Sequence, residues 1–221
     1  MINIMENKIL LIKEPSDFND INFSNISDDG LVGISPELNV DLIQSSYKLG
    51  IFPWFNKKEP ILWWSPNPRQ VLFIDKYKPS KSLLREIKKN KFIFEINKNF
   101  PAVIRACRNV QRKESGTWID ARIIDNYTRL HQIGHAHSFE IYNMENSLVG
   151  GIYGILTQNV FFGESMFHLE NNASKICFYF LCRWLKEKGI RVIDAQVESE
   201  HISKWGGELI SRDKFMDIIM R

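Results

Sequence analysis

His137-Ser-Phe-Glu-Ile-Tyr142 is followed, after a turn at Glu145-Asn146, by Leu148-Val-Gly-Gly-Ile-Tyr-Gly-Ile-Leu156. This stretch decides the fold class, because its two halves have the alternation and the β-branched and aromatic content of an antiparallel hairpin. Gly150 and Gly151 lie inside the second predicted strand. Glycines at such positions indicate either a bulge or the close approach of another backbone or a ligand.

The segments downstream of the hairpin add a strand, a helix and a last strand. Val160–Gly163 is predicted as a short strand. A helix is predicted from about Ala173 to Lys188, with Asn172 as its N-cap candidate and Gly189 at its end. Val192–Gln196 returns as a strand. Hairpin, strand, helix and strand in this order predict an α+β fold.

Residues 1–68 differ from the rest of the chain. They are rich in turn signals, and the clear helical stretch among them runs from about Glu37 to Leu49 and ends at Gly50. The segment 51–68 holds three of the six tryptophans and four of the eight prolines. The prolines exclude a regular helix or a central strand here, so we expect the aromatic rings on stiff, extended backbone. There the rings pack in the core or form a platform for nucleic-acid bases.

The composition indicates a globular protein. The chain has 221 residues, of which 44% are hydrophobic and 25% charged, and no apolar run approaches the roughly 20 residues of a membrane helix. The segment Met1–Ile12 offers no small-residue cleavage site and does not resemble a signal peptide, so we expect a cytoplasmic protein. The three cysteines form no CxxC motif, which excludes a disulfide framework and predicts buried, reduced thiols.

Positive charge is concentrated between Lys76 and Lys91, where seven basic residues accompany one acid, Glu86. The net charge of +3 is by itself weak evidence for a polyanionic partner. Ser80 is an N-cap candidate for a helix in this stretch. Three basic residues spaced four and three apart share one face of that helix: Lys81, Arg85 and Lys88. This face follows a phosphate backbone or is a solvated helix face, and the charge pattern alone favours the second.

The motifs of several common enzyme classes are missing from the sequence. His131, His135 and His137 cluster, but no cysteine or acid is spaced to complete a metal shell. The segment Gly163-Glu-Ser-Met-Phe167 lacks the second glycine of a hydrolase nucleophile elbow. The sequence contains no phosphate-binding P-loop and no GxGxxG after a strand. We therefore expect neither a metal nor another cofactor.

Three polar residues stand at the ends of predicted strands. Glu164 follows the apolar run Val160-Phe-Phe162, and alternation sends Asp194 and Gln196 to one face of their strand, opposite Ala195. A carboxylate and an amide side by side can orient an amine nucleophile. They can equally form a structural pair that satisfies a loop, and the spacing alone favours that alternative.

Several longer motifs resemble those of one protein family. They are Gly50-Ile-Phe-Pro-Trp-Phe55, Ile61-Leu-Trp-Trp-Ser-Pro-Asn-Pro-Arg69, Gly116-Thr-Trp-Ile119, Leu130-His-Gln-Ile-Gly-His-Ala-His-Ser138, Leu148-Val-Gly-Gly-Ile-Tyr-Gly154, Phe162-Gly-Glu-Ser-Met-Phe167, Asn172-Ala-Ser-Lys175 and Ile193-Asp-Ala-Gln196. On these residues the chain resembles the leucyl/phenylalanyl-tRNA-protein transferases, from about Leu31 to its C-terminal end.

The resemblance implies a fold and an activity. It implies a small N-terminal domain, placed at residues 1–68, and a catalytic domain at residues 69–221 that resembles the GNAT N-acyltransferase fold. The implied enzyme is an aminoacyltransferase that moves Leu, Phe and, less readily, Met from aminoacyl-tRNA to the α-amino group of proteins with N-terminal Lys or Arg. This transfer marks those proteins for degradation through the N-degron pathway. The implied partners are aminoacyl-tRNA and such acceptor proteins, and no membrane takes part.

The resemblance also implies roles for individual residues. Four of them hold the aminoacyl-adenosine end of the tRNA: Trp54, Trp118, Tyr127 and Glu164. An apolar pocket for the aminoacyl side chain is lined by residues equally suited to plain core packing: Ile152, Phe161, Met166, Phe178, Leu181, Leu185 and Ile193. The catalytic pair is Asp194 and Gln196. Because a carboxamide oxygen is a very poor base, we expect Gln196 to accept a hydrogen bond from the amine while Asp194 orients it. The face of Lys81, Arg85 and Lys88 is a hypothesis for the contact with the tRNA backbone.

The chain departs from the family pattern at Lys204-Trp-Gly-Gly207, where Ser-Leu-Gly-Ala is usual. Lys204 lies near the presumed acceptor end, and its charge opposes the selection of a basic N-terminal residue unless the side chain points away. The sequence therefore leaves the acceptor preference open.

Three other functions are compatible with parts of the sequence. A small-molecule acetyltransferase needs a glycine-rich loop for a pyrophosphate, and residues 167–172 contain no glycine. A non-catalytic RNA-binding module accounts for the basic face but leaves Asp194, Gln196 and Glu164 unexplained. A transferase of the same family that uses another amino acid or another N-terminal residue is the third alternative.

Overall fold

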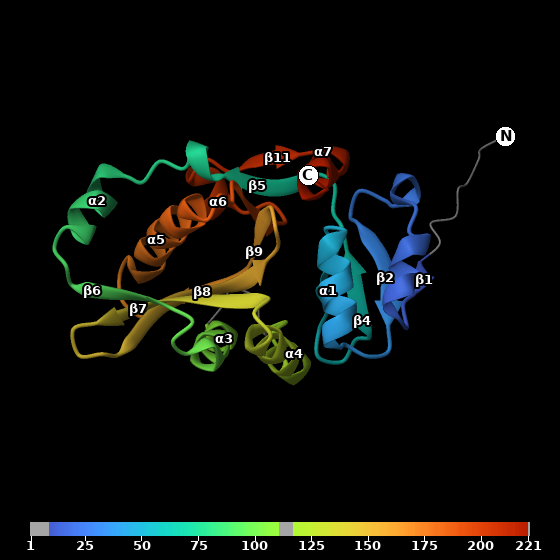
Figure 1. Ribbon diagram of the computed structural model, residues 1–221, viewed down its shortest axis with the longest axis horizontal. Coiled ribbons are helices and arrows are strands. Elements are labelled where there is room, and N and C mark those ends of the chain that lie inside the picture. The colour runs from blue at the N-terminus through green and yellow to red at the C-terminus, as the bar shows by residue number, and fades with distance from the viewer. Residues whose placement is uncertain (1–8, 111–116, 221) are drawn as a thin grey trace.

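The structure, a computed structural model, describes residues 9–110 and 117–220 (Figure 1). Residues 1–8, which make up most of the segment considered as a signal peptide, and Gly116 of one family motif lie outside the described residues. In the part of the chain that is described, no helix combines the length and the apolar character needed to cross a membrane.

A four-stranded sheet is formed by the first part of the chain. In spatial order its strands are β1 (Leu10–Leu11), β2 (Leu31–Ser35), β4 (Ile61–Trp64) and β3 (Phe52–Pro53). Helix α1 (Val40–Lys48) accompanies this sheet, together with the 3-10 turns η1 (Pro15–Asp20) and η2 (Phe23–Asn25). The helix begins at Asn39, whose side-chain oxygen accepts the backbone N–H of Leu42 at 2.9 Å, and Gly50 follows its end with φ 66°. The predicted helix before Gly50 is confirmed.

The prediction that the segment 51–68 holds no central strand is wrong. Strand β4 pairs with β2 on one side and with β3 on the other. Pro60 and Pro66 lie outside β4, so all four of its residues keep the backbone N–H that a central strand needs. Pro53 belongs to the edge strand β3, where a missing N–H is tolerated.

The tryptophans of this segment divide between the core and the surface. Trp63 is fully buried, packs edge-on against Phe18 at 5.2 Å between ring centroids, and donates its indole N–H to the Ser35 hydroxyl at 2.6 Å. Trp54 is 44% exposed. Core packing is therefore confirmed for Trp63, and a platform for bases stays a prediction for the exposed Trp54.

A seven-stranded sheet contains the predicted hairpin. In spatial order its strands are β11 (Glu208–Ile210), β5 (Arg69–Phe73), β10 (Val192–Gln196), β9 (Val160–His168), β8 (Leu148–Leu156), β7 (Ala136–Asn143) and β6 (Phe92–Ile96). The β9–β10 pair is parallel and the other pairs of this sheet are antiparallel. The mixed α+β class is confirmed, and β9 extends five residues further than the predicted strand that ended at Gly163.

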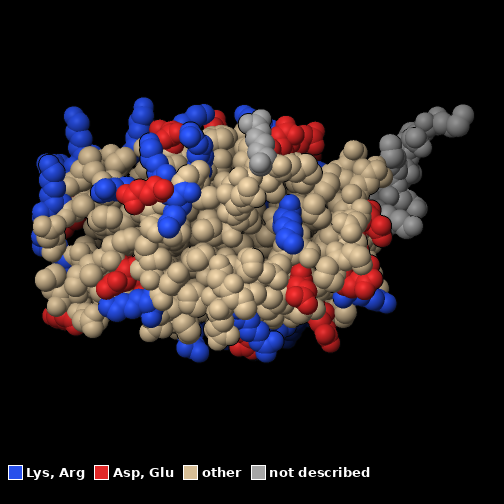
Figure 2. All heavy atoms as spheres, in the orientation of Figure 1, with Lys and Arg blue, Asp and Glu red and all other residues tan. Residues whose placement is uncertain are grey.

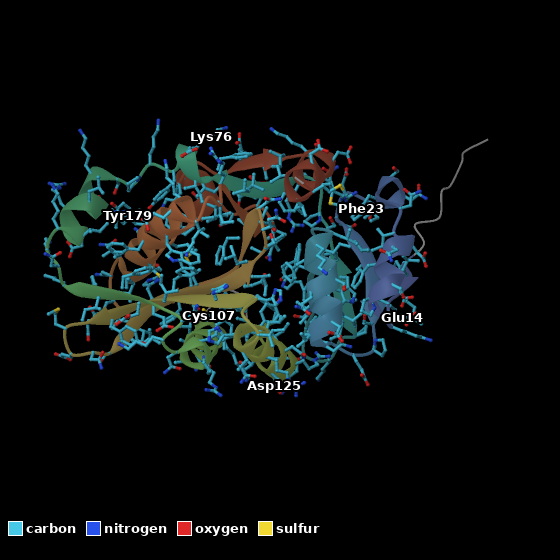
Figure 3. The ribbon with its side chains drawn as sticks, in the orientation of Figure 1. Glu14, Phe23, Lys76, Cys107, Asp125 and Tyr179 are labelled. Carbon is cyan, nitrogen blue, oxygen red and sulfur yellow. The ribbon has the colours of Figure 1, made fainter. Side chains whose placement is uncertain are left out.

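Helices cover both faces of this sheet (Figures 1 and 3). Helix α5 (Ala173–Glu187) packs on one face, and α3 (Phe100–Asn109) and α4 (Ala121–Gln132) pack on the other. Figure 3 labels Tyr179 on α5 and Cys107 on α3, on opposite sides of the sheet. All three cysteines are buried, as predicted.

Gly150 and Gly151 allow the close packing of these layers. A Cβ on Gly150 would lie 2.8 Å from the Ala173 Cβ at the start of α5, and one on Gly151 would lie 3.3 Å from Val103 of α3. The pairing of β7 with β8 also shifts register beside Gly150, between Ile141 and Tyr142. The close approach and the bulge, which the sequence offered as alternatives, are both present.

The last helix of the described chain is hydrogen-bonded to the first part of the chain. The remaining elements are α2 (Lys81–Ile87), α6 (Glu200–Lys204), α7 (Arg212–Ile219) and the 3-10 turn η3 (Ile74–Lys76). The buried guanidinium of Arg212 donates to the carbonyl oxygens of Ser65 (2.8 Å), Ser27 (2.9 Å) and Phe23 (3.2 Å). These bonds link α7 to the segment that precedes β2 and to the residue that follows β4.

Candidate functional site

The site begins where β9 and β10 part. Their parallel pairing ends with Asp194 opposite Phe162, whereas β9 continues to His168. Beyond this point β10 has an irregularity between Asp194 and Gln196, and Gln196 adopts φ 66°. A cavity of about 230 Å³, called the site cavity here, opens at the parting and is lined by Phe52, Pro53, Trp54, Trp118, Gly163, Glu164, Ala195, Gln196 and Val197.

A buried ion pair lies behind this cavity. Arg69 donates from Nε to Asp194 Oδ1 at 2.8 Å and from a terminal nitrogen to Oδ2 at 2.6 Å, and the two side chains are 1% and 0% exposed. The guanidinium lies against the rings of Phe52 and Phe215, at 4.8 and 4.6 Å from their centroids. Such a two-point contact fixes the carboxylate plane as well as its position.

Asp194 holds the backbone of Gln196 rather than its side chain. Asp194 Oδ1 accepts the backbone N–H of Gln196 at 2.9 Å, which closes the bend that gives Gln196 its positive φ. The prediction that simple alternation places Asp194 and Gln196 on one face, with Ala195 turned away, is wrong because the strand is irregular here. Ala195 and Gln196 both line the site cavity, and Asp194 is fully buried.

The Gln196 side chain is oriented by Glu164. Its amide nitrogen donates to Glu164 Oε1 at 3.1 Å. Because an ionised carboxylate only accepts hydrogen bonds, the amide nitrogen must face it, and the amide oxygen is directed to another donor.

Glu164 is itself held by two buried tyrosines. Tyr47 of α1 donates to Glu164 Oε1 at 2.5 Å, and the hydroxyl of Tyr127 of α4 lies 3.2 Å from Oε2 and 2.7 Å from the Tyr47 hydroxyl. Both tyrosines are at most 1% exposed and Glu164 is 9% exposed. Residues from α1, α4 and β9 therefore meet at one carboxyl group.

Burial raises the pKa of Glu164 to about 7. The hydrogen bonds from Tyr47, Tyr127 and Gln196 lower this pKa, and the nearby charge of Asp194 raises it further. Burial also raises the pKa of both tyrosines well above the usual value, so their hydroxyl groups keep their protons. Near neutral pH the Glu164 carboxyl group is therefore present in both protonation states.

Trp54, Trp118 and Tyr127 occupy different positions relative to the cavity. Trp54 and the half-buried Trp118 both line it. The Trp54 ring lies edge-on to Trp64 at 6.2 Å, and Trp64 donates its indole N–H to the Trp54 carbonyl oxygen at 2.6 Å. Tyr127 is fully buried and is linked to the site through its hydrogen bonds with Glu164 and Tyr47.

The residues expected to form an aminoacyl pocket come together in one apolar cluster. Six of them are at most 3% exposed within it: Ile152, Phe161, Phe178, Leu181, Leu185 and Ile193. Met166 packs against this cluster and also lines a second cavity of about 1230 Å³, called the adjoining cavity here. Trp205 covers Phe178, with 4.2 Å between the ring centroids.

Lys204 carries a charge that is paired on its own helix. Its ammonium group lies 2.7 Å from Glu200 Oε1, one turn earlier in α6, and both side chains are exposed. The positive charge of Lys204, which we expected near the acceptor peptide, is thus paired with the negative charge of Glu200.

The basic face of α2 lies apart from these residues. Ser80 caps the helix by accepting the Leu83 N–H at 3.1 Å, and Lys81, Arg85 and Lys88 are all exposed. Figure 2 shows Lys and Arg side chains gathered over this end of the molecule. In Figure 1, α2 and the site-bearing helix α1 lie toward opposite ends of the long axis.

Arg69 and Tyr47 are the residues of this site that sequence reasoning missed. Arg69 begins one apolar strand, and Asp194 is the acid within another apolar strand. A basic and an acidic residue in two apolar strands could have suggested that they form a buried ion pair. Tyr47 lies on the apolar face of α1, where nothing in the sequence distinguishes it from a core residue.

Comparisons with known proteins point to one family. Residues 71–220 match the family described as "Leucyl/phenylalanyl-tRNA protein transferase", and residues 36–67 match its "N-terminal domain". A protein of that name from Hydrogenovibrio crunogenus is 45% identical over 192 residues, covering 86% of this chain and 75% of the relative. One from Shewanella piezotolerans is 44% identical over 190 residues, covering 86% and 80%.

A solved structure shares the fold. The crystal structure of FemX aligns with a TM-score of 0.51 over 81% of this chain and 69% of that chain, at 12% identity. At this identity the likeness shows the arrangement of helices and strands alone.

Proposed function

Because this chain belongs to the leucyl/phenylalanyl-tRNA protein transferase family, we propose that it moves Leu or Phe, and less readily Met, from tRNA to protein N-termini. The acceptors are proteins that begin with Lys or Arg. The product marks them for degradation through the N-degron pathway in the cytoplasm. We further propose that residues 69–221 form a GNAT-like catalytic domain and residues 1–68 a small N-terminal one.

The observation that carries this proposal is the site cavity. Two tryptophan rings, Trp54 and Trp118, line it together with the polar side chains of Glu164 and Gln196. Exposed aromatic rings stack on nucleic-acid bases at about 1 to 3 kcal/mol per base. A terminal adenosine stacked there presents its aminoacyl ester to Gln196.

The reaction needs little acid or base chemistry. The acceptor amine attacks the ester carbonyl carbon, the bond from that carbon to the ribose oxygen breaks, and a peptide bond forms. One proton is lost by the amine and one is gained by the ribose oxygen. Since an α-amine has a pKa of about 7.7 to 8, part of it is already neutral at physiological pH. The enzyme therefore acts mainly by positioning, which can supply several kcal/mol of the barrier.

Gln196 and Asp194 divide the positioning between them. The Gln196 amide oxygen accepts an N–H of the amine and aims its lone pair at the carbonyl carbon. Glu164 fixes which end of the amide faces the substrate, and Asp194 fixes the backbone that carries it. Arg69 binds both oxygens of the Asp194 carboxyl group and so holds it in place.

The apolar cluster around Phe178 and Leu181 supports the choice of donor. An apolar aminoacyl side chain gains about 1.5 to 3 kcal/mol when it is buried there. A charged side chain is excluded by the cost of desolvation. We propose that Met166, which packs against this cluster and lines the adjoining cavity, stands at the entrance to this pocket, and that Ile193 lines its interior.

The exposed cations of α2 are proposed to bind tRNA phosphates. Helix α2, which carries Lys81 and Arg85 and is followed by Lys88, lies far along the molecule from α1 in Figure 1. A tRNA whose 3′ end is in the site cavity extends well beyond it, so a contact with its body at that distance is expected.

A transfer assay tests the proposal. The protein is incubated with tRNA charged with labelled Leu, Phe, Met or Asp and with peptides that differ in their first residue. Label should move from Leu and Phe to peptides that begin with Lys or Arg, and not from Asp. Replacing Asp194 by Ala should slow transfer about 100-fold or more, as expected for a misplaced reacting group.

A second variant separates loss of chemistry from loss of folding. Asp194→Ala leaves the buried Arg69 unpaired, whereas Gln196→Ala removes no buried charge. The Gln196→Ala variant should melt close to the wild type and still lose most of its transfer rate. Tight tRNA binding without any transfer to any peptide would show the protein to be an RNA-binding module instead.

A further inference from the structure

The adjoining cavity continues the gap in which the site cavity lies. Strand β9 contributes Glu164 to the site cavity and Met166 and His168 to the adjoining one. The chain after β10 contributes Gln196 to the first and His201 to the second. Because β9 and the chain after β10 contribute to both cavities, a molecule whose end lies at Gln196 can extend along β9 into the adjoining cavity.

The edge of β9 along this gap offers backbone hydrogen bonds. On its other edge, β9 stays paired with β8 to its end, through Ile152 opposite Met166 and Gly150 opposite His168. Toward β10 the pairing of the described residues stops at Phe162. A strand edge of this kind can add an extended polypeptide, with the main chain providing affinity and the side-chain sites providing selectivity.

One lysine and two histidines stand at the outer end of the adjoining cavity. Lys175 at the start of α5, His168 and His201 line it and are exposed, and none of its described lining residues is acidic. Burial, followed by the charge of Lys175, lowers the pKa of His201, so near neutral pH this imidazole is mainly uncharged and Lys175 supplies the positive charge among the described lining residues. The nearby acid Glu200 is engaged by Lys204.

The size and lining of this cavity suit a polypeptide. Its volume of about 1230 Å³ exceeds the roughly 300 to 1,000 Å³ of small-molecule pockets. Apolar side chains such as Phe167 and Val110 alternate around it with amides such as Asn109 and Asn172. The tryptophans suited to nucleotide bases line the site cavity instead.

We infer that the adjoining cavity holds the acceptor polypeptide beyond its first residue, extended along β9, with acidic side chains of the acceptor against Lys175, His168 and His201. This inference rests on the function proposed above. The basic first residue of the acceptor lies at the Glu164 end of the gap, and Lys175 and the two histidines lie at the other end. Glu164 and His168 are four residue steps apart on β9, about 13 Å of extended chain. An acidic residue at the fourth or fifth position of the acceptor therefore reaches Lys175, and one at the second position does not.

Acceptor peptides of six residues test this inference. All begin with Lys, and they carry a glutamate at the fifth position, a glutamate at the second position or a lysine at the fifth position. With the wild type, we expect the KM for the peptide with glutamate at its fifth position to be about 3- to 5-fold below that for the peptide with lysine there, the size of a screened surface ion pair. A glutamate at the second position should have no such effect.

A matched pair of variants places the effect in the cavity. Lys175→Glu should reverse the preference between glutamate and lysine at the fifth position of the peptide, with kcat and the KM for aminoacyl-tRNA unchanged. Lys188→Glu, at the other end of α5 and outside the cavity, should behave as the wild type. N-methylation of the peptide backbone at its third and fourth residues should raise the peptide KM, because it removes hydrogen-bond donors to β9.

Three results would overturn the inference. If all six-residue peptides and a Lys-started dipeptide share one KM while transfer proceeds, the acceptor does not occupy the cavity and the proposed function still stands. If Lys175→Glu raises the KM for aminoacyl-tRNA alone, the cavity holds RNA. If no peptide of any length is modified, the proposed function fails and the inference with it.

Discussion

At the scale of single residues, the carboxyl group of Glu164 decides which way the Gln196 amide points. The ionised form accepts the amide N–H at 3.1 Å, whereas the protonated form donates a proton of its own and no longer requires that orientation. Burial brings the pKa of this group to about 7, in spite of the hydroxyl groups of Tyr47 and Tyr127. The orientation of the Gln196 amide therefore depends on the protonation state of Glu164, which changes near neutral pH.

This raised pKa predicts how stability changes with pH. Between pH 4.5 and about 7 the folded protein keeps a proton on Glu164 that the unfolded chain has released. Folding therefore binds a proton in this range, so this residue makes the protein less stable as the pH rises, and the effect levels off above pH 7. The full difference is about 3 kcal/mol.

Urea unfolding of the wild type and of Glu164→Gln at several pH values measures this effect. The free energy of unfolding of the wild type should fall relative to that of the variant from pH 4.5 to 7, and the two should run parallel above pH 7. Parallel curves over the whole range would show that the pKa of Glu164 is not raised.

The pair of Arg69 and Asp194 predicts a large cost for removing one partner. Arg69→Met leaves a carboxylate that is 0% exposed without its cation, so we expect the free energy of unfolding to fall by about 3 to 5 kcal/mol. Adding Asp194→Asn should restore part of this loss, because the stranded charge is then gone. Thermal and urea unfolding of the three proteins measure both steps, and equal stability of the single and double variants would argue against a buried charge.

At the scale of elements, the β8–β9 pair holds two glycines beside a shift in its register between Tyr153 and Gly154. Gly154 and Gly163 face each other across the pair. A Cβ on Gly154 would lie 2.1 Å from the Phe162 carbonyl oxygen, whereas one on Gly163 would meet nothing closer than 3.6 Å. The two glycines are equivalent by position in the hairpin but not by the space around them.

Alanine at these two positions should therefore have opposite effects on stability. Gly154→Ala forces backbone apart, and we expect it to destabilise the protein by about 1 to 3 kcal/mol, the usual cost of overpacking. Gly163→Ala should be neutral or stabilising by up to about 1 kcal/mol, because it restricts the unfolded chain. Melting temperatures of the two variants decide this, and similar losses for both would contradict it.

The elements that the sequence predicted are those with a local signal. The hairpin, helix α5 and strand β10 follow from alternation, an apolar stripe and glycines that end them. Strands β1 and β3 have two residues each, too few for any periodicity, and so the first sheet could not be foreseen. The irregularity at Asp194 and Gln196 depends on hydrogen bonds to Asp194 and is invisible to an alternation rule.

The candidate site could be foreseen only in part, for a related reason. Glu164, Asp194 and Gln196 stood out as polar residues at strand ends. Arg69 and Tyr47 are 125 and 117 residues distant in sequence from the carboxyl groups that they bind, and only the folded chain brings them together. The resemblance to the family named residues, but it did not show that Tyr127 acts through Glu164 or that Asp194 binds the Gln196 backbone.

At the scale of the whole molecule, charge is distributed unevenly along the long axis. Figure 2 shows basic side chains gathered over α2 and a surface of mainly uncharged residues across the middle of that face. The aromatic side chains of the site cavity and the cations of α2 are thus separate surfaces. A tRNA is long enough to contact both, and a short aminoacyl-nucleoside is not.

This separation predicts different salt responses for two substrates. Reversing Lys81, Arg85 and Lys88 to Glu should raise the KM for aminoacyl-tRNA and flatten its dependence on salt, because fewer counterions are then released. The same variant should use an aminoacyl-adenosine fragment as well as the wild type does. Initial rates at several salt concentrations measure both substrates, and an unchanged salt slope for tRNA would exclude α2 from the contact.

The central claim is that Gln196 works by position, as an acceptor of the amine N–H, and is not a base. Its most direct test is the single-turnover rate of transfer from Phe-tRNA to a Lys-started peptide by Gln196→Glu, Gln196→Ala and Asp194→Ala, measured side by side near pH 6.5. At that pH the new carboxyl group and Glu164 share a proton, as two adjacent carboxyl groups do, and an acceptor oxygen remains in place. We predict that Gln196→Glu keeps its rate within about tenfold of the wild type, while Gln196→Ala loses about 100-fold. A rate for Gln196→Glu as low as that of Asp194→Ala would contradict the account.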